Sequence, residues 1–254
     1  MTTIMISVML ILLLAGFPMM MPLIVSTLIA FFFFLDPLKP TIVIQQMVGG
    51  VQPTALVAIP MFMLAADIIT RGHSANRLID LVMNFIGHIR GGLAITVAAT
   101  CTLFGAVSGS TQATVVAVGG PMRPKMLKSG YNDSFTMALI INSSDIAFLI
   151  PPSIGMIVYG VMSGTSISEL FIAGIGPGLL ILLMFSLYSY AYATAKDIPT
   201  EERASWDDRF RALRKAVWPL GFPVIIIGGI YGGIFSPTEA ASICVAYAFI
   251  LEIL

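Results

Sequence analysis

Charged side chains are scarce in this chain. Only 10% of its 254 residues are Asp, Glu, Lys or Arg, whereas 57% are hydrophobic and the mean hydropathy is +0.96. A soluble domain has about a quarter charged residues, so this composition excludes an ordinary soluble globular protein. Several windows of about 17–20 residues are almost free of charge, and that length crosses the ~30 Å hydrocarbon core of a bilayer. The sequence therefore predicts an all-α polytopic membrane protein that lies in a lipid bilayer.

Cysteine and histidine, which often act as catalytic groups or metal ligands, are scarce as well. The two cysteines, Cys101 and Cys244, lie in apolar segments, where packing is their expected role, and no metal-ligand spacing involves them. The two histidines, His73 and His88, lie on one amphipathic segment that we place at the membrane interface. The sequence has no ATP-binding loop, so any transport would take its energy from an ion gradient. We expect no organic cofactor, no nucleic-acid partner and no enzymatic activity.

Basic residues show how the chain is oriented in the membrane. Of the 13 Lys and Arg residues, all but Lys39 lie in three clusters: 71–90, 123–128 and 196–215. By the positive-inside rule, the three clusters face the cytoplasm. Four segments then each cross the membrane: residues 53–70, 131–161, 170–195 and 217–235. The connection at 162–169, which has no basic residue, is then periplasmic.

The first apolar run, residues 1–34, is too long for a signal peptide and lacks a basic start. It therefore belongs to the membrane structure. Gly16-Phe17-Pro18 interrupts it, so the run forms either one broken crossing or two short ones.

Residues 93–122 begin and end on the cytoplasmic side and contain a small polar centre, Ser108 to Gln112. The apolar halves, 93–107 and 111–122, reach about 22 and 18 Å as helices, which is short of a full crossing. We therefore predict a re-entrant helical hairpin whose polar tip is buried in protein or lines a watery cavity. Gly109 is expected at the tip because glycine adopts positive φ without steric cost. The alternative is a tight loop at the far surface.

A second interruption is predicted where Pro151-Pro152 removes two amide donors and disfavours helical geometry in the preceding residues. The helix of residues 131–165 should break there, near mid-membrane. The polar run Asn142 to Asp145 precedes the break by about two turns, and Asn142 and Asp145 share a helical face. A carboxylate inside a membrane segment indicates function or a buried partner. The alternative is a simple proline kink with Asp145 hydrogen-bonded to neighbouring helices.

Two broken helices place free backbone groups inside the membrane. Carbonyl ends, expected near Val107 and Leu149, suit Na⁺, and amide ends, expected near Thr111 and Ser153, suit an anionic group of a substrate. Many secondary transporters combine a hairpin with a proline-broken helix in this way. The candidate substrate-binding residues are the polar ones next to the breaks: Thr111, Gln112, Asn142, Ser144 and Asp145.

Two further segments, residues 73–90 and 199–217, are amphipathic. Each has an apolar face and a face with basic side chains, as expected for helices lying along the membrane interface. The first directly precedes the hairpin, so it could act as a lever or frame for the hairpin. A passive connector fits the sequence equally well.

Five motifs resemble a known family and occur in its order: GHIRGGLA (87–94), FGAVSGS (104–110), LIPPSIGMIVYG (149–160), SGTSISELFIAGIGPGLL (163–180) and GGIYGGIFSPTEAAS (228–242). Over nearly the whole chain they resemble the large membrane subunit of tripartite ATP-independent periplasmic (TRAP) transporters. The resemblance implies an elevator-type secondary transporter in the bacterial inner membrane that imports organic acids with Na⁺. It also implies two partners, a small membrane (Q) subunit and a periplasmic substrate-binding (P) protein. The implied sodium site lies between the hairpin tip and the proline break, at Ser108, Gly109, Ser110, Pro151, Pro152 and Ser153.

The chain departs from that family in two ways. Large subunits of the family are about twice as long and contain two inverted repeats, so we expect this chain to be the N-terminal half. NSSD (142–145) replaces mostly small apolar residues, so Asp145 marks a subgroup or has a structural role. The expected domains are a scaffold with its arm helix at 1–90, a transport half at 91–165 (hairpin 91–128, broken helix 131–165), and scaffold helices at 166–254.

Two other functions compete with transport. An intramembrane enzyme would need a base beside a nucleophile, for example a histidine beside Ser108. A non-transporting half that only binds partner membrane subunits is the second alternative.

Overall fold

Helices make up all of the regular structure in a computed structural model of the chain, which describes residues 1–34 and 40–253. No strand occurs among these residues. Three helical segments are long and apolar enough to cross a membrane: Thr54–Arg71, Ile167–Ala195 and Trp206–Tyr231. The predicted all-α fold with apolar spans is confirmed. Lys39 lies outside the described residues.

The described chain divides into two compact units, residues 1–52 and 53–254. The first unit contains α1 (Thr2–Leu14), α2 (Met20–Phe34) and α3 (Pro40–Val51). The helices α1 and α2 pack against each other, and Gly16 lies between them with a φ of 83°. At 13 and 15 residues they reach about 20 and 22 Å, less than a hydrocarbon core. Residues 1–34 thus form two short helices on either side of the predicted interruption, and whether they make one broken crossing or two short ones stays a prediction.

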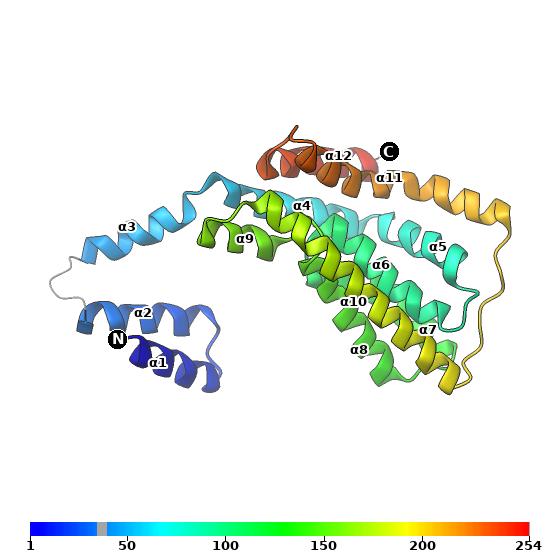
Figure 1. Cartoon of the computed structure of the whole chain (residues 1–254), viewed down its shortest axis with the longest axis horizontal. Helices are drawn as coiled ribbons and strands as arrows, with labels where there is room; N and C mark the ends of the chain where they lie inside the picture. The colour runs from blue at the N-terminus through cyan, green and yellow to red at the C-terminus, as the bar shows by residue number, and fades with distance from the viewer. Residues whose placement is uncertain (35–39, 254) are drawn as a thin grey trace. The chain divides into compact units, whose positions relative to one another are not determined.

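The second unit contains all the predicted site residues (Figure 1). Its elements are a 3₁₀ turn η1 (Thr54–Val57), α4 (Ala58–Arg71), α5 (Ser74–Ile86), α6 (Gly92–Ser108), α7 (Thr111–Lys128), α8 (Asp133–Ser144), a second 3₁₀ turn η2 (Asp145–Phe148), α9 (Ile154–Ser163), α10 (Ile167–Ala195), α11 (Trp206–Tyr231) and α12 (Pro237–Ile253).

Helix α6 forms the centre of this unit. It is buried on nearly all sides and packs against α5, α7, α8 and α10. Its residues are mostly small or apolar, and a helix that is apolar all round is typically buried. Both cysteines, Cys101 on α6 and Cys244 on α12, are free and buried, as predicted for packing residues.

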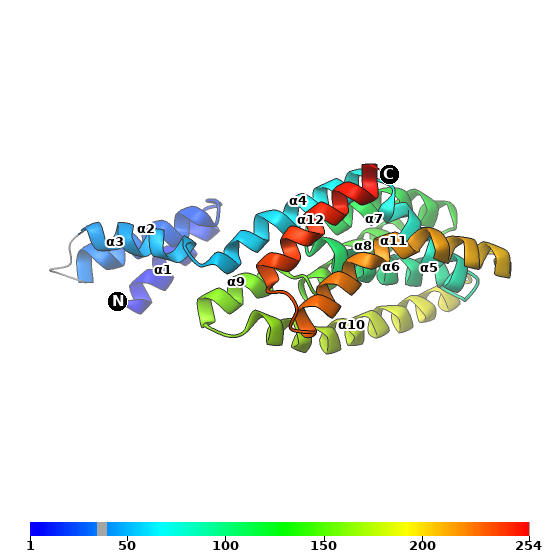
Figure 2. The same cartoon turned by 90° about the horizontal axis from the view of Figure 1, so that it is seen from above.

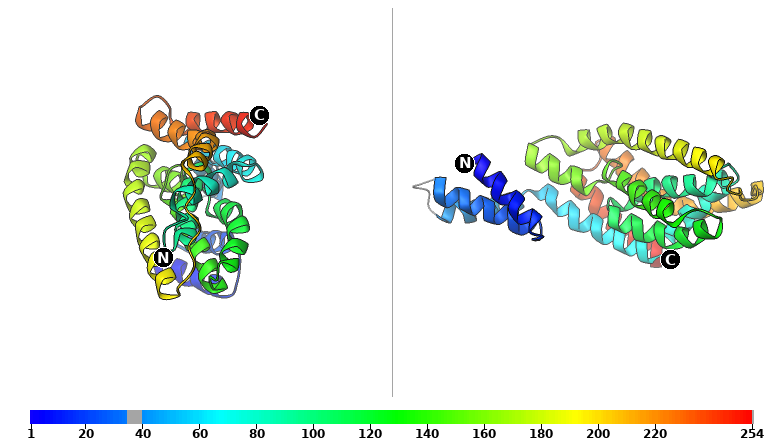
Figure 3. Two further views of the ribbon diagram at one scale, coloured as in Figure 1. Left: turned by 90° about the vertical axis from the view of Figure 1, so that its right-hand side faces the viewer. Right: turned by 90° about the horizontal axis from the view of Figure 1, so that it is seen from below.

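Helices α11 and α12 lie over α5 and α4, respectively, and α10 runs along one edge of the unit (Figure 2, Figure 3). Helix α12 is joined to α5 by a carboxylate. Glu252 accepts a hydrogen bond from the His73 amide at 3.0 Å and another from the Ser74 hydroxyl. Neither His73 nor another local side chain caps α5, so Glu252 supplies the acceptor that a helix N-terminus needs.

An ion pair closes the connection between α7 and α8. The Arg123 guanidinium donates to both carboxylate oxygens of Asp133, at 2.9 and 3.0 Å. These charge-assisted hydrogen bonds fix the relative position of the two side chains. Both side chains are exposed, and Arg123 belongs to a predicted cytoplasmic cluster, so the main effect of the pair is on geometry.

Two helices differ from the sequence prediction. The amphipathic segment 199–217 is not a separate interfacial helix, because α11 begins at Trp206 and continues without interruption to Tyr231. Pro219 and Pro223 lie inside α11, and each removes only one helical hydrogen bond, which a long helix tolerates. Similarly, α7 continues through Pro121 and Pro124 to Lys128, so the second half of the hairpin has 18 residues, about 27 Å. Length alone therefore no longer distinguishes a re-entrant hairpin from two short crossings.

Helix α10 packs closely on the interrupted segment between α8 and α9. A Cβ added at Gly174 would collide with the Leu149 carbonyl oxygen, and one added at Gly178 would lie 2.6 Å from Ile150 Cδ1. Gly176, between them in sequence, has open space around it. Glycine at positions 174 and 178 therefore lets the α10 backbone approach the break.

We predict unequal effects from alanine at two neighbouring glycines. Gly174→Ala should lower the free energy of unfolding by about 1–3 kcal/mol, because the new methyl group overpacks a backbone contact. Gly176→Ala should change it by less than about 1 kcal/mol, because no other element lies near that position and the gain in helix propensity offsets the contact of the new methyl group with Pro177. Thermal unfolding of the two purified variants in detergent tests this. Equal melting temperatures would contradict the close packing of α10.

Candidate functional site

The tip between α6 and α7 is a two-residue turn. Gly109 ends α6 in the left-handed region, at a φ of 60°, and its amide donates to the Gly105 carbonyl at 2.8 Å. Ser110 then begins α7 as its N-cap, since its hydroxyl accepts a hydrogen bond from the Ala113 amide at 3.4 Å. The turn matches a glycine C-cap followed directly by a serine N-cap. The positive φ expected at Gly109 is confirmed.

Side-chain hydroxyl groups form hydrogen bonds within this turn. Ser108 is fully buried, and its Oγ lies 3.2 Å from Thr114 Oγ1 and accepts from the Ser110 amide at 3.3 Å. Thr114 Oγ1 in turn donates to the Ser110 carbonyl at 2.9 Å. The sequence analysis missed Thr114. Its position one turn into α7, six residues after Ser108, was the available signal.

The second interruption lies between α8 and α9. The α-helix ends at Ser144, η2 follows, and the chain is non-helical until Ile154. Ser153 connects the two sides, because its hydroxyl donates to the Phe148 carbonyl at 2.6 Å and accepts from the Met156 amide at 3.2 Å. Pro151, Pro152 and Ser153 are all buried, and the Pro151-Pro152 peptide bond is cis.

The two interruptions meet. A Cβ on Gly109 would collide with the Pro152 carbonyl oxygen, so the tip and the break are in direct backbone contact. A second close approach lies one turn away, where a Cβ on Gly105 would be 2.8 Å from Ala147 Cα. The structure therefore brings together the six residues predicted for sodium binding.

Oxygen atoms are the available ligands at this meeting point. The last turn of α6 leaves carbonyl groups without helical partners, and the Pro152 carbonyl and the Ser108 hydroxyl lie beside it. Within the described part of the chain, no three His, Cys, Asp or Glu side chains gather into a metal site. Carbonyl and hydroxyl oxygens suit a hard, weakly bound cation such as Na⁺, so the donor set fits that ion.

Residues 6–254 match the family model described as tripartite ATP-independent periplasmic transporter, DctM component. The chain belongs to this DctM family. It is 68% identical over 253 residues to the ectoine TRAP transporter large permease protein TeaC of Halomonas elongata, which covers 99% of this chain and 59% of the relative. It is 67% identical over 247 residues to the ectoine/5-hydroxyectoine TRAP transporter large permease protein UehC of Ruegeria pomeroyi, covering 97% and 58%.

A third relative is named for another substrate. The C4-dicarboxylate TRAP transporter large permease protein DctM of Pseudomonas aeruginosa is 46% identical over 193 residues, which cover 76% of this chain and 45% of the relative. The DctM-family chain thus spans about three fifths of the length of its two ectoine-named relatives. All three relatives are named as permease proteins rather than enzymes, in agreement with the prediction of no enzymatic activity. The alternative of an intramembrane enzyme requires a histidine beside Ser108. The hydrogen-bond partners of the Ser108 hydroxyl are the Ser110 carbonyl and the Thr114 hydroxyl.

The five predicted substrate-binding residues of this DctM-family chain lie in different surroundings. The exposed Asn142 side chain donates to its own helix, at the Ala138 carbonyl, and lines a groove between α8 and α10. Ser144 is buried and donates to the Ile140 carbonyl, whereas Asp145 is exposed. Asp145 begins the 3₁₀ turn η2, in which residues three apart still share a face, so the prediction that Asn142 and Asp145 line a cavity together stays a prediction.

The remaining two residues, Thr111 and Gln112, lie at the tip itself. Gln112 is exposed and accepts from the Ser110 hydroxyl at 3.2 Å. Thr111 Oγ1 is buried without a hydrogen-bond partner, so this hydroxyl has unused capacity beside the start of α7.

The sequence analysis also missed Asp67. This carboxylate belongs to the apolar segment Thr54–Arg71 and lies 3.0 Å from Arg71. With Ser110 and Gln112 it lines a groove of about 300 Å³ between α4 and the start of α7. The signal was the charge itself, because an ionisable residue within a predicted crossing indicates function. Asp67 gives the tip an acidic neighbour on α4.

The contact between tip and break predicts a position-specific effect of alanine. Gly109 and Gly164 both end a helix at similar positive φ, 60° and 72°, but Gly164 has open space around it. Gly109→Ala and Gly164→Ala therefore share a left-handed strain of about 1–2 kcal/mol. Gly109→Ala should lose about 1–3 kcal/mol more, because its methyl group collides with the Pro152 carbonyl.

Thermal unfolding of both variants in the same detergent measures the difference. Equal destabilisation would mean that only the backbone conformation matters at Gly109, and would contradict a tight contact between tip and break.

Proposed function

We propose that the protein to which this chain belongs is the large permease subunit of a secondary transporter that imports a small organic acid together with Na⁺. One observation supports this most strongly: the tip of the α6–α7 pair and the break between η2 and α9 are in backbone contact at Gly109 and Pro152. Two helix interruptions packed together concentrate unpaired backbone dipoles at one place, and secondary transporters use such places for ions and substrates.

The chemistry follows from the direction of each helix. The C-terminal end of α6 presents carbonyl oxygens, and with the Pro152 carbonyl it would hold Na⁺. The N-terminal ends of α7 and α9 present amide groups, with Ser110 and Ser153 as their caps. A carboxylate of the substrate would bind at these amide ends, where helix dipoles favour negative charge. A bound cation would then strengthen the attraction for the carboxylate across a short distance, which couples the two.

The names of the relatives indicate which substrates to test. The two at 68% and 67% identity are named for ectoine, whereas the relative at 46% is named for C4-dicarboxylates. We therefore propose ectoine as the first substrate to test, with a C4-dicarboxylate as the comparison. The proposed assembly also contains a small membrane (Q) subunit and a periplasmic (P) protein that delivers substrate.

The proposed movement is of the elevator type, in the inner membrane of a bacterium. Helices α6, α7 and α8 and the turn η2 pack against one another and would move as one body within residues 91–165, and the contacts of α6 with α5 and α10 would then be the surface along which this body moves. Residues 1–90 and 166–254 would form the static part. In this proposal the site at Gly109 and Pro152 is carried across the membrane intact.

Sodium coupling has a direct test. The full-length protein with both partners, reconstituted in liposomes, should take up radiolabelled ectoine only when Na⁺ is higher outside. Replacing Na⁺ by choline at matched pH and membrane potential should abolish uptake, since the cation ligands are oxygen atoms that bind no bulky organic cation. Na⁺ should also raise the melting temperature of the purified protein over choline, because a ligand of the native state stabilises it. Uptake that is equal in choline would refute sodium coupling.

The proposed orientation has a separate test. In a variant without Cys101 and Cys244, single cysteines at Lys125 and Ser166 report opposite sides of the membrane. An impermeant thiol reagent added to the periplasmic side should label Ser166→Cys and leave Lys125→Cys unlabelled. The reverse pattern would overturn the assignment of basic clusters to the cytoplasm.

A further inference from the structure

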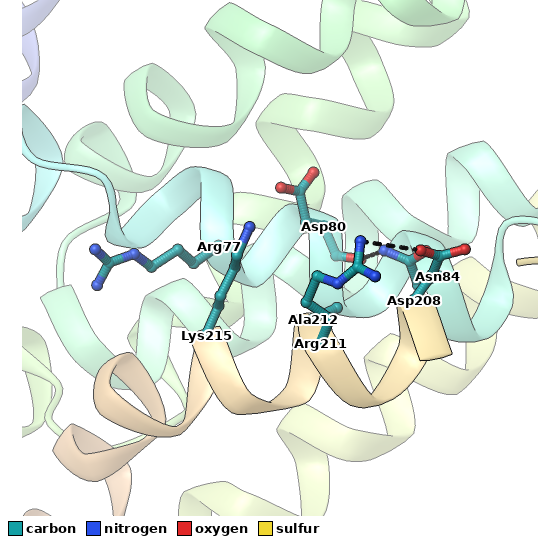
Figure 4. Close-up of a pocket in the computed structure, with 7 residues that line it drawn as sticks. All are labelled: Arg77, Asp80, Asn84, Asp208, Arg211, Ala212 and Lys215. Carbon is teal, nitrogen blue, oxygen red and sulfur yellow. Dashed lines mark hydrogen bonds and ion pairs between the residues drawn. The ribbon is translucent and has the colours of Figure 1, made fainter. Parts of the chain in front are cut away.

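A charged groove runs between α5 and the first half of α11 (Figure 4). Its larger part has a volume of about 620 Å³ and its smaller part about 160 Å³. Both parts are lined by Arg77 and Asp80 from α5 and by Arg211 and Lys215 from α11, so they form one continuous hollow, which we call the arm groove.

Positive charge dominates the arm groove. Its lining includes four basic side chains and only two carboxylates, Asp80 and Asp208. The single ion pair among these groups joins Arg211 to Asp208 at 3.5 Å between exposed side chains, so it is weak. Arg77, Arg214 and Lys215 form no ion pair within residues 1–34 and 40–253. The groove therefore offers cationic donors that no protein group neutralises.

A buried guanidinium holds the two walls together at one end. Arg209 is only 6% exposed, and its Nε donates to the Asn84 carbonyl at 3.1 Å in the last turn of α5. Its Cζ lies 5.0 Å from the Trp206 ring centroid and 5.7 Å from that of Phe85. One of its nitrogens, Nη2, is buried without a partner. The walls are thus fixed by a cation–π and hydrogen-bonded contact that adds one more unpaired positive charge near the groove.

Apolar side chains border the same groove. Trp218 lines its larger part and is 60% exposed. Trp206 and Phe210 do not line the groove, but they lie on the same part of α11 and are 73% and 71% exposed. Exposed tryptophan next to basic side chains is typical of the level at which lipid headgroups meet acyl chains. An acidic protein partner would need the charge but not this apolar border.

We propose that the arm groove binds the headgroup of an anionic phospholipid from the cytoplasmic leaflet. The phosphate would lie among Arg77, Arg211 and Lys215, and the acyl chains would lie along Trp218. Basic pockets on the cytoplasmic side of membrane proteins are suited to such headgroups, each Lys or Arg adding attraction. The inference rests on the proposed orientation of the basic clusters, but it does not depend on sodium coupling.

The test measures binding of phosphatidylglycerol to the purified, delipidated chain by native mass spectrometry, with phosphatidylcholine as the comparison lipid. Arg77→Gln with Lys215→Gln should weaken phosphatidylglycerol binding about tenfold or more. Lys125→Gln with Lys128→Gln on α7 removes the same charge from exposed positions outside the groove and should leave binding unchanged. Asp80→Asn should strengthen binding, because it removes a negative charge from the groove.

Several outcomes would overturn the proposal. Equal loss in the two double variants would indicate general electrostatic attraction and no specific site. Equal binding of phosphatidylcholine would show that the groove does not select an anionic lipid. Inorganic phosphate that displaces the lipid at equal concentration would indicate a free-anion site. If the variant with Arg77→Gln and Lys215→Gln is unstable, the Asp80→Asn variant alone decides the test. Weaker or unchanged binding of phosphatidylglycerol to Asp80→Asn would contradict the proposal.

Discussion

The contact between the Gly109 backbone and the Pro152 carbonyl is the constraint around which the second unit is arranged. Two non-helical segments at membrane depth need their polar groups buried in protein or facing a watery cavity, and hydrogen bonds satisfy part of them here. Ser108, Ser110, Thr114 and Ser153 do this with side-chain hydrogen bonds to the turn and break. Glycine is required where the segments touch, because any side chain at residue 109 would displace the carbonyl. Helix α6 therefore lies at the centre, and its C-terminal end places the tip against the break.

The glycines of α6 and α10 extend the same principle to the surroundings. Gly105 allows α6 to approach η2 at Ala147, and Gly174 allows α10 to approach Leu149. The backbones of α6 and α10 therefore lie close to the break, with no bulky side chain between these elements. Close backbone approach through small residues is a general way to pack helices where burial from water supplies no attraction between them.

The sequence predicted those features that depend on local chemistry. Polar residues in an apolar run marked the tip at Ser108 to Ser110, and two adjacent prolines marked the break, because both signals act through the backbone of neighbouring residues. It failed where the outcome depends on helix continuation. Nothing local shows that the α-helix ends at Ser144 and continues as a 3₁₀ turn from Asp145, before the proline pair is reached. The segments 199–217 and 217–235 were predicted as separate elements, yet α11 runs from Trp206 through both to Tyr231.

Because α11 is one continuous helix, its full length determines how it can lie in a bilayer. At 26 residues it is about 39 Å long, whereas a hydrocarbon core is about 30 Å thick. A helix of that length, standing across the bilayer, must leave about two turns in the headgroup layer, and the turns with the basic side chains are its first ones. Arg209 and its neighbours would then lie in the part of α11 that extends beyond the hydrocarbon core, and a displacement there would reach the spanning part with no loop between them.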